Sequence, residues 1–170
     1  MVVLGRSSDP ARELDIAACL ADRVRVIRRK SGGGAVVIAP GCLNYSLRVS
    51  LERFPALRDI RGSYRLILGA LLRALAVPGL EIRGLADLAL ENRKVSGNAQ
   101  RRDAQSLLHH GTLLYAFDPR LAMRYLRSPA REPEYRAGRE HIEFLGNLPL
   151  TAAEIRARLA RFYFDPMANR

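Results

Sequence analysis

Three consecutive glycines follow a run of basic residues in the segment 28–34, which reads RRKSGGG. Glycine tolerates positive φ and lets a ligand approach the main chain, whose N–H groups can cradle a phosphate. The arginines add permanent charge and a planar fork that suits phosphate or carboxylate. The segment is neither a Walker loop nor a dinucleotide fingerprint. The favoured interpretation is a site for a phosphate or an acyl phosphate, and a flexible hairpin turn is the alternative.

Lys94 begins a second glycine-marked segment, 94–100, which reads KVSGNAQ. Of the 28 basic residues only two are lysines, Lys30 and Lys94, and both lie near glycines. A compact ammonium on a strand near Gly97 could bridge a carboxylate oxygen and an α-phosphate while pyrophosphate is displaced. From these residues alone, an ordinary exposed strand lysine is slightly the better interpretation.

Other polar residues give less specific signals. His109 and His110 are adjacent on an expected strand, so they face opposite sides and are poor partners for one metal ion. Asp87 could hold Mg²⁺ or a ribose, although one carboxylate is a weak signal. Cys42 is expected to be a small buried hydrophobic residue rather than a nucleophile.

The 170 residues, 48% hydrophobic and 26% charged, predict one globular domain over 1–170. There is no apolar run of about 18 residues and no signal-peptide pattern, so we expect a cytoplasmic protein. Two cysteines do not make a disulfide scaffold or a zinc site. The net charge of +11 favours an anionic partner. Nucleic acid is disfavoured, because the basic residues are scattered and no RNA-binding aromatic motif is present.

The elements that must position these residues mix helices and strands without a regular βαβ alternation. We therefore expect an α+β fold with a mixed or antiparallel sheet and packed helices. The strictly alternating segment 43–51 is the clearest strand. Further strands are expected at 24–27, 35–39, 80–83, 86–90, 94–100 and 107–116. Helices are expected at 10–24, 63–77 and 119–126, and from the capping box Thr151–Glu154 to about Tyr163, with a surface loop at 128–139.

Taken together, the chain resembles the catalytic domain of lipoate–protein ligases, within the biotin/lipoate protein ligase superfamily. The matching segments, in family order, are 28–36, 41–44, 87–88, 94–101 and 109–114. The resemblance covers the chain from about Val2 to Tyr163. It implies the catalytic fold of biotin ligases and class II aminoacyl-tRNA synthetases, here without the family's N-terminal portion and C-terminal accessory domain.

The resemblance implies an ATP-dependent ligase, which forms lipoyl-AMP and transfers the lipoyl or octanoyl group to a lysine of a carrier domain. The implied cofactors are ATP and Mg²⁺, with lipoate as the substrate. The implied partners are lipoyl domains of 2-oxoacid dehydrogenase complexes or the glycine-cleavage carrier protein, and, as for some short relatives, a separate accessory protein. Neither nucleic acid nor a membrane is an expected partner.

The resemblance also implies the site residues. Lys94 is the implied catalytic residue, in contact with the acyl carbonyl and the α-phosphate, and Asp87 is the implied metal ligand. The implied ATP-binding residues are Arg29, Gly34, Ala35, Val36, Val37, Asn44, Asp87 and Lys94. The implied lipoate-binding residues are Arg29, Ser31, Gly32, Gly33, Lys94, Gly97, Arg101 and His110.

Two other functions remain open. One is a lipoyl or octanoyl transferase that uses a preformed acyl donor and needs no ATP. A related branch of octanoyl transferases works through a cysteine shortly before the lysine motif. No cysteine lies between Cys42 and Lys94, which argues against that chemistry. The other is a non-catalytic, truncated homologue that binds acyl groups or lipoyl domains.

Overall fold

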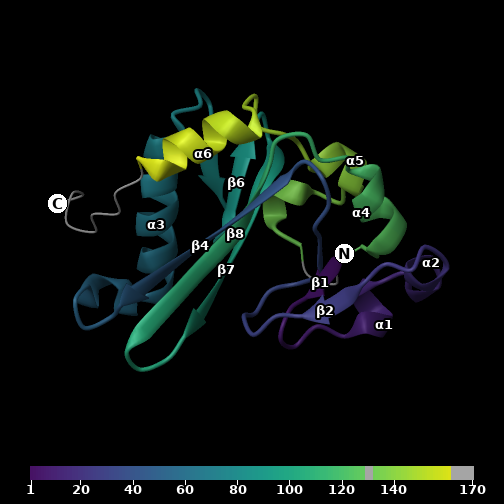
Figure 1. The fold of residues 1–170 in the computed structure, drawn as a ribbon, viewed down its shortest axis with the longest axis horizontal. Helices are drawn as coiled ribbons and strands as arrows, with labels where there is room; N and C mark the ends of the chain where they lie inside the picture. Colours follow the sequence, from purple (N-terminus) through teal and green to yellow (C-terminus); the bar gives the residue numbers. More distant parts are fainter. Residues whose placement is uncertain (129–131, 162–170) are drawn as a thin grey trace.

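The computed structural model describes residues 1–128 and 132–161. Two sheets organise the chain (Figure 1). The larger sheet is antiparallel, with the order β4-β8-β7-β6-β5, and its strands are β4 (Cys42–Ser50), β5 (Glu81–Arg83), β6 (Asp87–Leu90), β7 (Arg93–Arg102) and β8 (Ser106–Leu114). The smaller sheet has the order β2-β1-β3, with β1 (Val2–Leu4) parallel to β2 (Val26–Arg28) and antiparallel to β3 (Val36–Val37). The expected α+β class with a mixed or antiparallel sheet is confirmed.

Two helices, α3 (Ile60–Leu75) and α6 (Ala152–Ala160), cover one face of the larger sheet (Figure 1). The buried residues of α3 recur at helical spacing, as Tyr64, Leu68, Leu71 and Leu75, and they pack against Leu113 and other residues of the sheet. The remaining helical elements are α1 (Pro10–Glu13), α2 (Ile16–Ala21), α4 (Arg120–Tyr125), α5 (His141–Phe144) and the 3₁₀ turns Pro55–Arg58 and Glu134–Arg136. None of the described helices is long and apolar enough to cross a bilayer.

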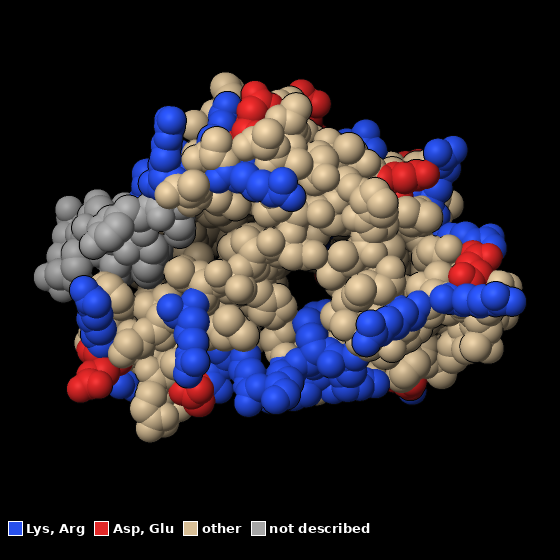
Figure 2. Space-filling model, in the orientation of Figure 1, with Lys and Arg blue, Asp and Glu red and all other residues tan. Residues whose placement is uncertain are grey.

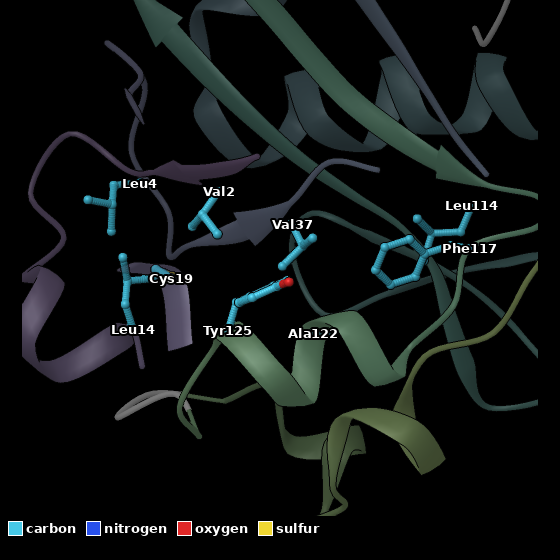
Figure 3. Packing of buried hydrophobic residues seen from close by; sticks show 9 residues of the cluster. All are labelled: Val2, Leu4, Leu14, Cys19, Val37, Leu114, Phe117, Ala122 and Tyr125. Carbon is cyan, nitrogen blue, oxygen red and sulfur yellow. The ribbon is translucent and has the colours of Figure 1, made fainter. Parts of the chain in front are cut away.

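A second core joins the smaller sheet to α2, α4 and the end of β8 (Figure 3). Its buried members are Val2, Leu4, Leu14, Cys19, Val37, Leu114, Phe117, Ala122 and Tyr125. Leu114 belongs to this cluster, whereas its neighbour Leu113 belongs to the core beneath α3. Because successive strand residues face opposite sides, the small sheet is anchored on the face of the larger sheet that α3 leaves free.

The structure corrects two expectations about the elements. The helix expected at 10–24 is two short helices, because Asp15 begins a new one by accepting a hydrogen bond from Ala18 N at 2.8 Å. The segment 128–139, expected to be a surface loop, contains a 3₁₀ turn in which Arg136 is buried. Helix α5, which follows it, was not predicted. The last helix begins with the expected capping box at Thr151, whereas its expected end at Tyr163 lies outside the described residues.

Candidate functional site

A row of residues, called the polar row below, crosses the larger sheet on the face turned away from α3. From β4 to β6 its members are in cross-strand register: Asn44, Thr112, Gly97 and Asp87. Directly opposed residues of antiparallel strands share a face, so three of the predicted site residues lie side by side with Thr112. The Thr112 hydroxyl donates to Asn44 Oδ1 at 2.9 Å. Thr112 was not among the residues predicted from the sequence, although it belongs to one of the matching segments.

A β-bulge brings Lys94 to the same face. Asp87 opposes Gly97, but the register then shifts, so that Lys94 opposes Ala89 and Val95 becomes the extra residue. In an unbroken strand, residues three apart such as Lys94 and Gly97 would face opposite sides. The bulge reverses that alternation and turns the Lys94 side chain toward the polar row.

The Lys94 ammonium forms an ion pair with Asp87, 2.8 Å from Oδ1. The other carboxylate oxygen, Oδ2, accepts a hydrogen bond from the Tyr135 hydroxyl at 3.0 Å. The Asp87 side chain is 12% exposed and that of Lys94 is 27% exposed, so the lysine side chain is the more accessible member of the pair. Burial, together with the neighbouring Asp87 charge and hydrogen bond, raises the pKa of Tyr135, which therefore stays a donor.

Gly97 leaves the space that the Lys94 side chain occupies. A Cβ atom added at Gly97 would lie 2.9 Å from Lys94 Cε and 3.1 Å from Nζ. Any larger residue would therefore displace the ammonium. The glycine was singled out from the sequence as allowing close approach, and the structure identifies the lysine itself as the approaching group.

Arg29 holds the glycine segment in place from within. Its Nη2 donates to the carbonyl oxygens of Gly32 and Gly34, at 2.7 and 2.9 Å. Its Nη1 donates to Val3 O at 3.2 Å, and its Nε donates to Ser31 Oγ at 3.1 Å. Most of the donors of this guanidinium thus serve the protein's own main chain. Arg28 does the same, donating to three carbonyl groups between residues 5 and 8.

Ser31 links the glycine segment to the larger sheet. Its Oγ lies 2.6 Å from His110 Nε2. The same Oγ accepts from Arg29 Nε, so Ser31 joins the arginine to the histidine. Burial, and then the Arg29 charge, lower the pKa of His110 and favour the neutral ring. His110 opposes Ala99, two residues along β7 from Gly97, so it shares the face of the polar row.

His109 points to the other face, as predicted. It is fully buried against Tyr64 of α3, and its ring nitrogens lie 3.1 Å from the Tyr45 hydroxyl and 3.1 Å from Gln100 Nε2. Burial lowers the pKa of His109 to about 4, so the ring is neutral at pH 7. It acts as a hydrogen-bonded core residue.

The main chain at the end of the glycine segment already holds a carboxylate. Ala35 N donates to Glu13 Oε2 at 2.6 Å. The next residues form β3, where the Val37 side chain is buried in the second core, so Val36 and Val37 offer a ligand chiefly their main chain. Glu13 was not singled out from the sequence, because nothing local connects the first helix with a turn about 20 residues later.

A cavity of about 390 Å³ lies between the glycine segment, the start of α3 and the outer end of β7. It is lined by Arg6, Lys30, Gly32, Ile60, Tyr64, Gln100, Arg101 and Arg102. Four of these residues are basic, and Figure 2 shows Lys and Arg side chains gathered next to a hollow between the two sheets. Two predicted lipoate-binding residues, Gly32 and Arg101, thus meet at one cavity. Within the described part of the chain, no hydrogen bond joins Lys94 directly to the glycine segment.

The remaining candidates can be placed in the same way. Gly33 adopts φ +89°, the left-handed conformation that a glycine allows in this turn. Cys42 is half-buried and burial raises the pKa of its thiol, which agrees with a small hydrophobic role. Among the described residues, no group of three or more His, Cys, Asp or Glu side chains could hold a metal ion.

Comparison with known proteins finds lipoate-protein ligases both by sequence and by structure. A provisionally named lipoate-protein ligase A of Schizosaccharomyces pombe is 37% identical over 130 residues, which is 76% of this chain and 34% of the relative. A crystal structure of a lipoate-protein ligase A bound with ATP superposes with a TM-score of 0.76 at 23% identity, covering 94% of this chain and 66% of the other.

A bipartite lipoate protein ligase of Thermoplasma acidophilum, studied with its E2 lipoyl domain, has a TM-score of 0.74 at 24% identity over 94% of this chain and 64% of the other. The chain therefore spans between about a third and two thirds of these proteins. The family model of the lipoyl protein ligase A/B catalytic domain matches residues 1–161. This chain belongs to the lipoyl protein ligase A/B catalytic domain family.

Proposed function

We propose that this chain carries the catalytic centre of an ATP-dependent lipoate–protein ligase. The observation that carries the proposal is the position of Lys94. A β-bulge and Gly97 together turn its ammonium toward the face on which His110 and Ser31 hold the glycine segment. One cation thus lies on the same face of the sheet as a main-chain turn suited to phosphate.

In the first step, a lipoate carboxylate oxygen attacks the α-phosphorus of ATP, and pyrophosphate leaves. Negative charge builds on the phosphoryl oxygens, and the Lys94 ammonium, shared between the acyl oxygen and the α-phosphate, stabilises it most in the transition state. In the second step, a lysine amine of the carrier attacks the acyl carbonyl, AMP leaves, and an amide forms. Lys94 then stabilises the developing oxyanion and the departing phosphate.

The nucleotide would be held by the main chain from Gly34 to Val37 and by Asn44. The hydrogen bond from Ala35 N to the Glu13 carboxylate supports this assignment, because the main chain there donates to an anionic oxygen. When bound, Mg²⁺ would neutralise phosphate charge. Mg²⁺ commonly binds through one or two carboxylates and the substrate phosphates, and Asp87 would supply such a carboxylate.

The acyl group would lie between the glycine segment and β7. Ser31, Gly32, Gly33, His110 and Arg101 would line its path, and Arg29 would act by fixing the segment. The basic surface would suit acidic carrier domains, and we propose lipoyl domains of 2-oxoacid dehydrogenases or the glycine-cleavage carrier as partners. The single-domain organisation, the accessory protein and the cytoplasmic location remain predictions.

The test is incubation of the chain with ATP, Mg²⁺, lipoate and an apo lipoyl domain, followed by mass spectrometry. A mass gain of one lipoyl group, dependent on ATP, is expected. No gain, even with an accessory protein added, would refute the proposal. Transfer from acyl carrier protein without ATP would instead identify the transferase, and binding without turnover would identify a non-catalytic homologue.

A further inference from the structure

We propose that Tyr135 is a positioning residue of this site, which fixes the Asp87 carboxylate and thereby the place from which Lys94 acts. This inference rests on the proposed function. From the sequence, Tyr135 was expected in a surface loop, and it lies outside the short motif segments on which the resemblance rests. In the structure, however, it is the second partner of the carboxylate that holds the catalytic ammonium.

The carboxylate of Asp87 has one donor on each oxygen. Lys94 Nζ contacts Oδ1 at 2.8 Å, and the Tyr135 hydroxyl contacts Oδ2 at 3.0 Å. A carboxylate without the phenol could rotate about its Cβ–Cγ bond, a broad and soft torsion, and could offer Lys94 either oxygen. With the phenol in place, only Oδ1 faces the ammonium.

The Tyr135 ring is held independently of its hydroxyl. It packs against Phe144 with centroids 5.1 Å apart, and the Arg83 guanidinium lies 5.7 Å from its centroid. Its main-chain oxygen accepts from Arg139 Nη2 at 2.8 Å, and the same nitrogen donates to Asn92 O at 2.9 Å. Replacing Tyr135 by Phe should therefore remove the hydroxyl and leave the ring in place.

Residues 142–146, which include the Phe144 ring against which Tyr135 packs, are fastened to the strand that carries Lys94. Gly146 N donates to Lys94 O at 2.9 Å, and Arg93 donates to main-chain oxygens of Ile142 and Leu145. The phenol and the ammonium are thus tied to one frame. Their separation across Asp87 is set by main-chain contacts as well as by the carboxylate.

The phenol also has a role when Lys94 moves toward the acyl oxygen and the α-phosphate. Asp87, taken as a whole residue, is only 8% exposed. A buried carboxylate left without any donor lowers the stability of the folded chain. Tyr135 keeps one hydrogen bond to Asp87 throughout. The ammonium can therefore turn to the substrate while the carboxylate keeps its place.

The test compares Tyr135→Phe with Tyr125→Phe. The Tyr125 hydroxyl also donates a hydrogen bond to an aspartate, 2.9 Å from Asp22 Oδ2, but Tyr125 lies in the second core beside the small sheet. Pyrophosphate release with ATP and lipoate should show kcat lowered about 10- to 100-fold in Tyr135→Phe, with KM for lipoate little changed. Tyr125→Phe should match the wild type.

A second readout does not depend on activity. A crystal structure of Tyr135→Phe should show the Asp87 carboxylate rotated about its Cβ–Cγ bond and Lys94 Nζ displaced from its wild-type place. An unchanged kcat, or an unchanged arrangement of Asp87 and Lys94, overturns the assignment. So does an equal fall of kcat in Tyr125→Phe, which would indicate a general structural effect. If the wild type itself forms no acyl adenylate, the proposed function fails, while the crystal structure still decides whether the phenol holds Asp87.

Discussion

Two carboxylates in this chain are each joined to one phenol and one cation. Asp22, at the end of α2, accepts from Tyr125 and from Arg124, both on α4. Arg124 reaches both oxygens of Asp22, through Nη2 at 2.8 Å and through Nε. The contacts lower the pKa of Asp22 to about 2. This set joins two helices.

The set around Asp87 has the same three chemical groups but a different consequence. Lys94 supplies a single donor to one oxygen, and the missing side chain of Gly97 leaves room for the lysine stem. A guanidinium fork fixes both oxygens of a carboxylate, whereas an ammonium on a flexible stem can exchange one oxygen for another. The comparison teaches that the type of cation and the space around it distinguish a structural ion pair from a reactive one.

The largest expected effect comes from removing each cation. Lys94→Ala should lower the rate of pyrophosphate release by 10²- to 10³-fold or more, on the order of what loss of one transition-state donor costs. Arg124→Ala should leave this rate near that of the wild type. Circular dichroism should confirm that both variants fold. Substantial activity in Lys94→Ala would remove the distinction between the two sets.

The next effect is a loss of stability at low pH, which sets the pH range in which the Asp22 and Asp87 sets can be compared. His109 has a pKa of about 4 in the folded chain, below the ordinary value of 6.5, so its neutral form is favoured by folding. Its contribution to stability is complete above pH 6.5 and is lost as the pH falls through about 4, amounting to about 3 kcal/mol. Urea unfolding at several pH values should show this loss, and His109→Gln should flatten it.

A smaller effect is expected when the space around Lys94 is filled. Gly97→Ala places a Cβ atom 2.9 Å from Lys94 Cε, and the flexible side chain must move, so we expect activity about tenfold lower with little change in stability. Gly69→Ala is the matched control, since its Cβ would meet only Arg73 Nη1 at 3.7 Å within α3. It should retain activity and gain about 0.5–1 kcal/mol of stability. Equal activity of the two variants would contradict the role of Gly97.

The smallest effect is a titration at the structural set. Asp22 should stay ionised through the range above about pH 4 in which His109 remains neutral. In Arg124→Ala its pKa should rise from about 2 toward the ordinary 3.8, so that protonation begins inside this range. NMR of the Asp22 carboxyl carbon measures the change. Protonation of wild-type Asp22 near pH 4 would show that the fork does not hold it.

Several features could be predicted from the sequence because their signals are local. The alternation of 43–51 gave β4, with Asn44, Ser46, Arg48 and Ser50 exposed. Adjacent histidines on one strand had to face opposite sides, and the structure places them so. The glycines near Lys30 and Lys94 marked the two segments that line the candidate site.

The rest depends on contacts between distant residues. Tyr135 reaches Asp87 across 48 residues, and Glu13 reaches Ala35 across 22, so no local pattern reveals either contact. The role of Arg29 was also hidden. A guanidinium near glycines predicts ligand binding, but that of Arg29 donates hydrogen bonds to main-chain oxygens. The face of Lys94 depended on a register shift that side-chain periodicity cannot indicate.

That extra residue at Val95 makes the site sensitive to chain length in a way that substitutions would not reveal. Inserting one residue between Lys94 and Gly97, with the bulge kept, moves Lys94 from opposite Ala89 to opposite Leu90 and turns the ammonium into the helix-covered side of the sheet. Deleting Val95 instead leaves a regular ladder in which Lys94 still opposes Ala89 and keeps its face. In a library of insertions and deletions, activity should therefore be lost with the insertion, whereas the deletion should keep the ammonium on the side of the site.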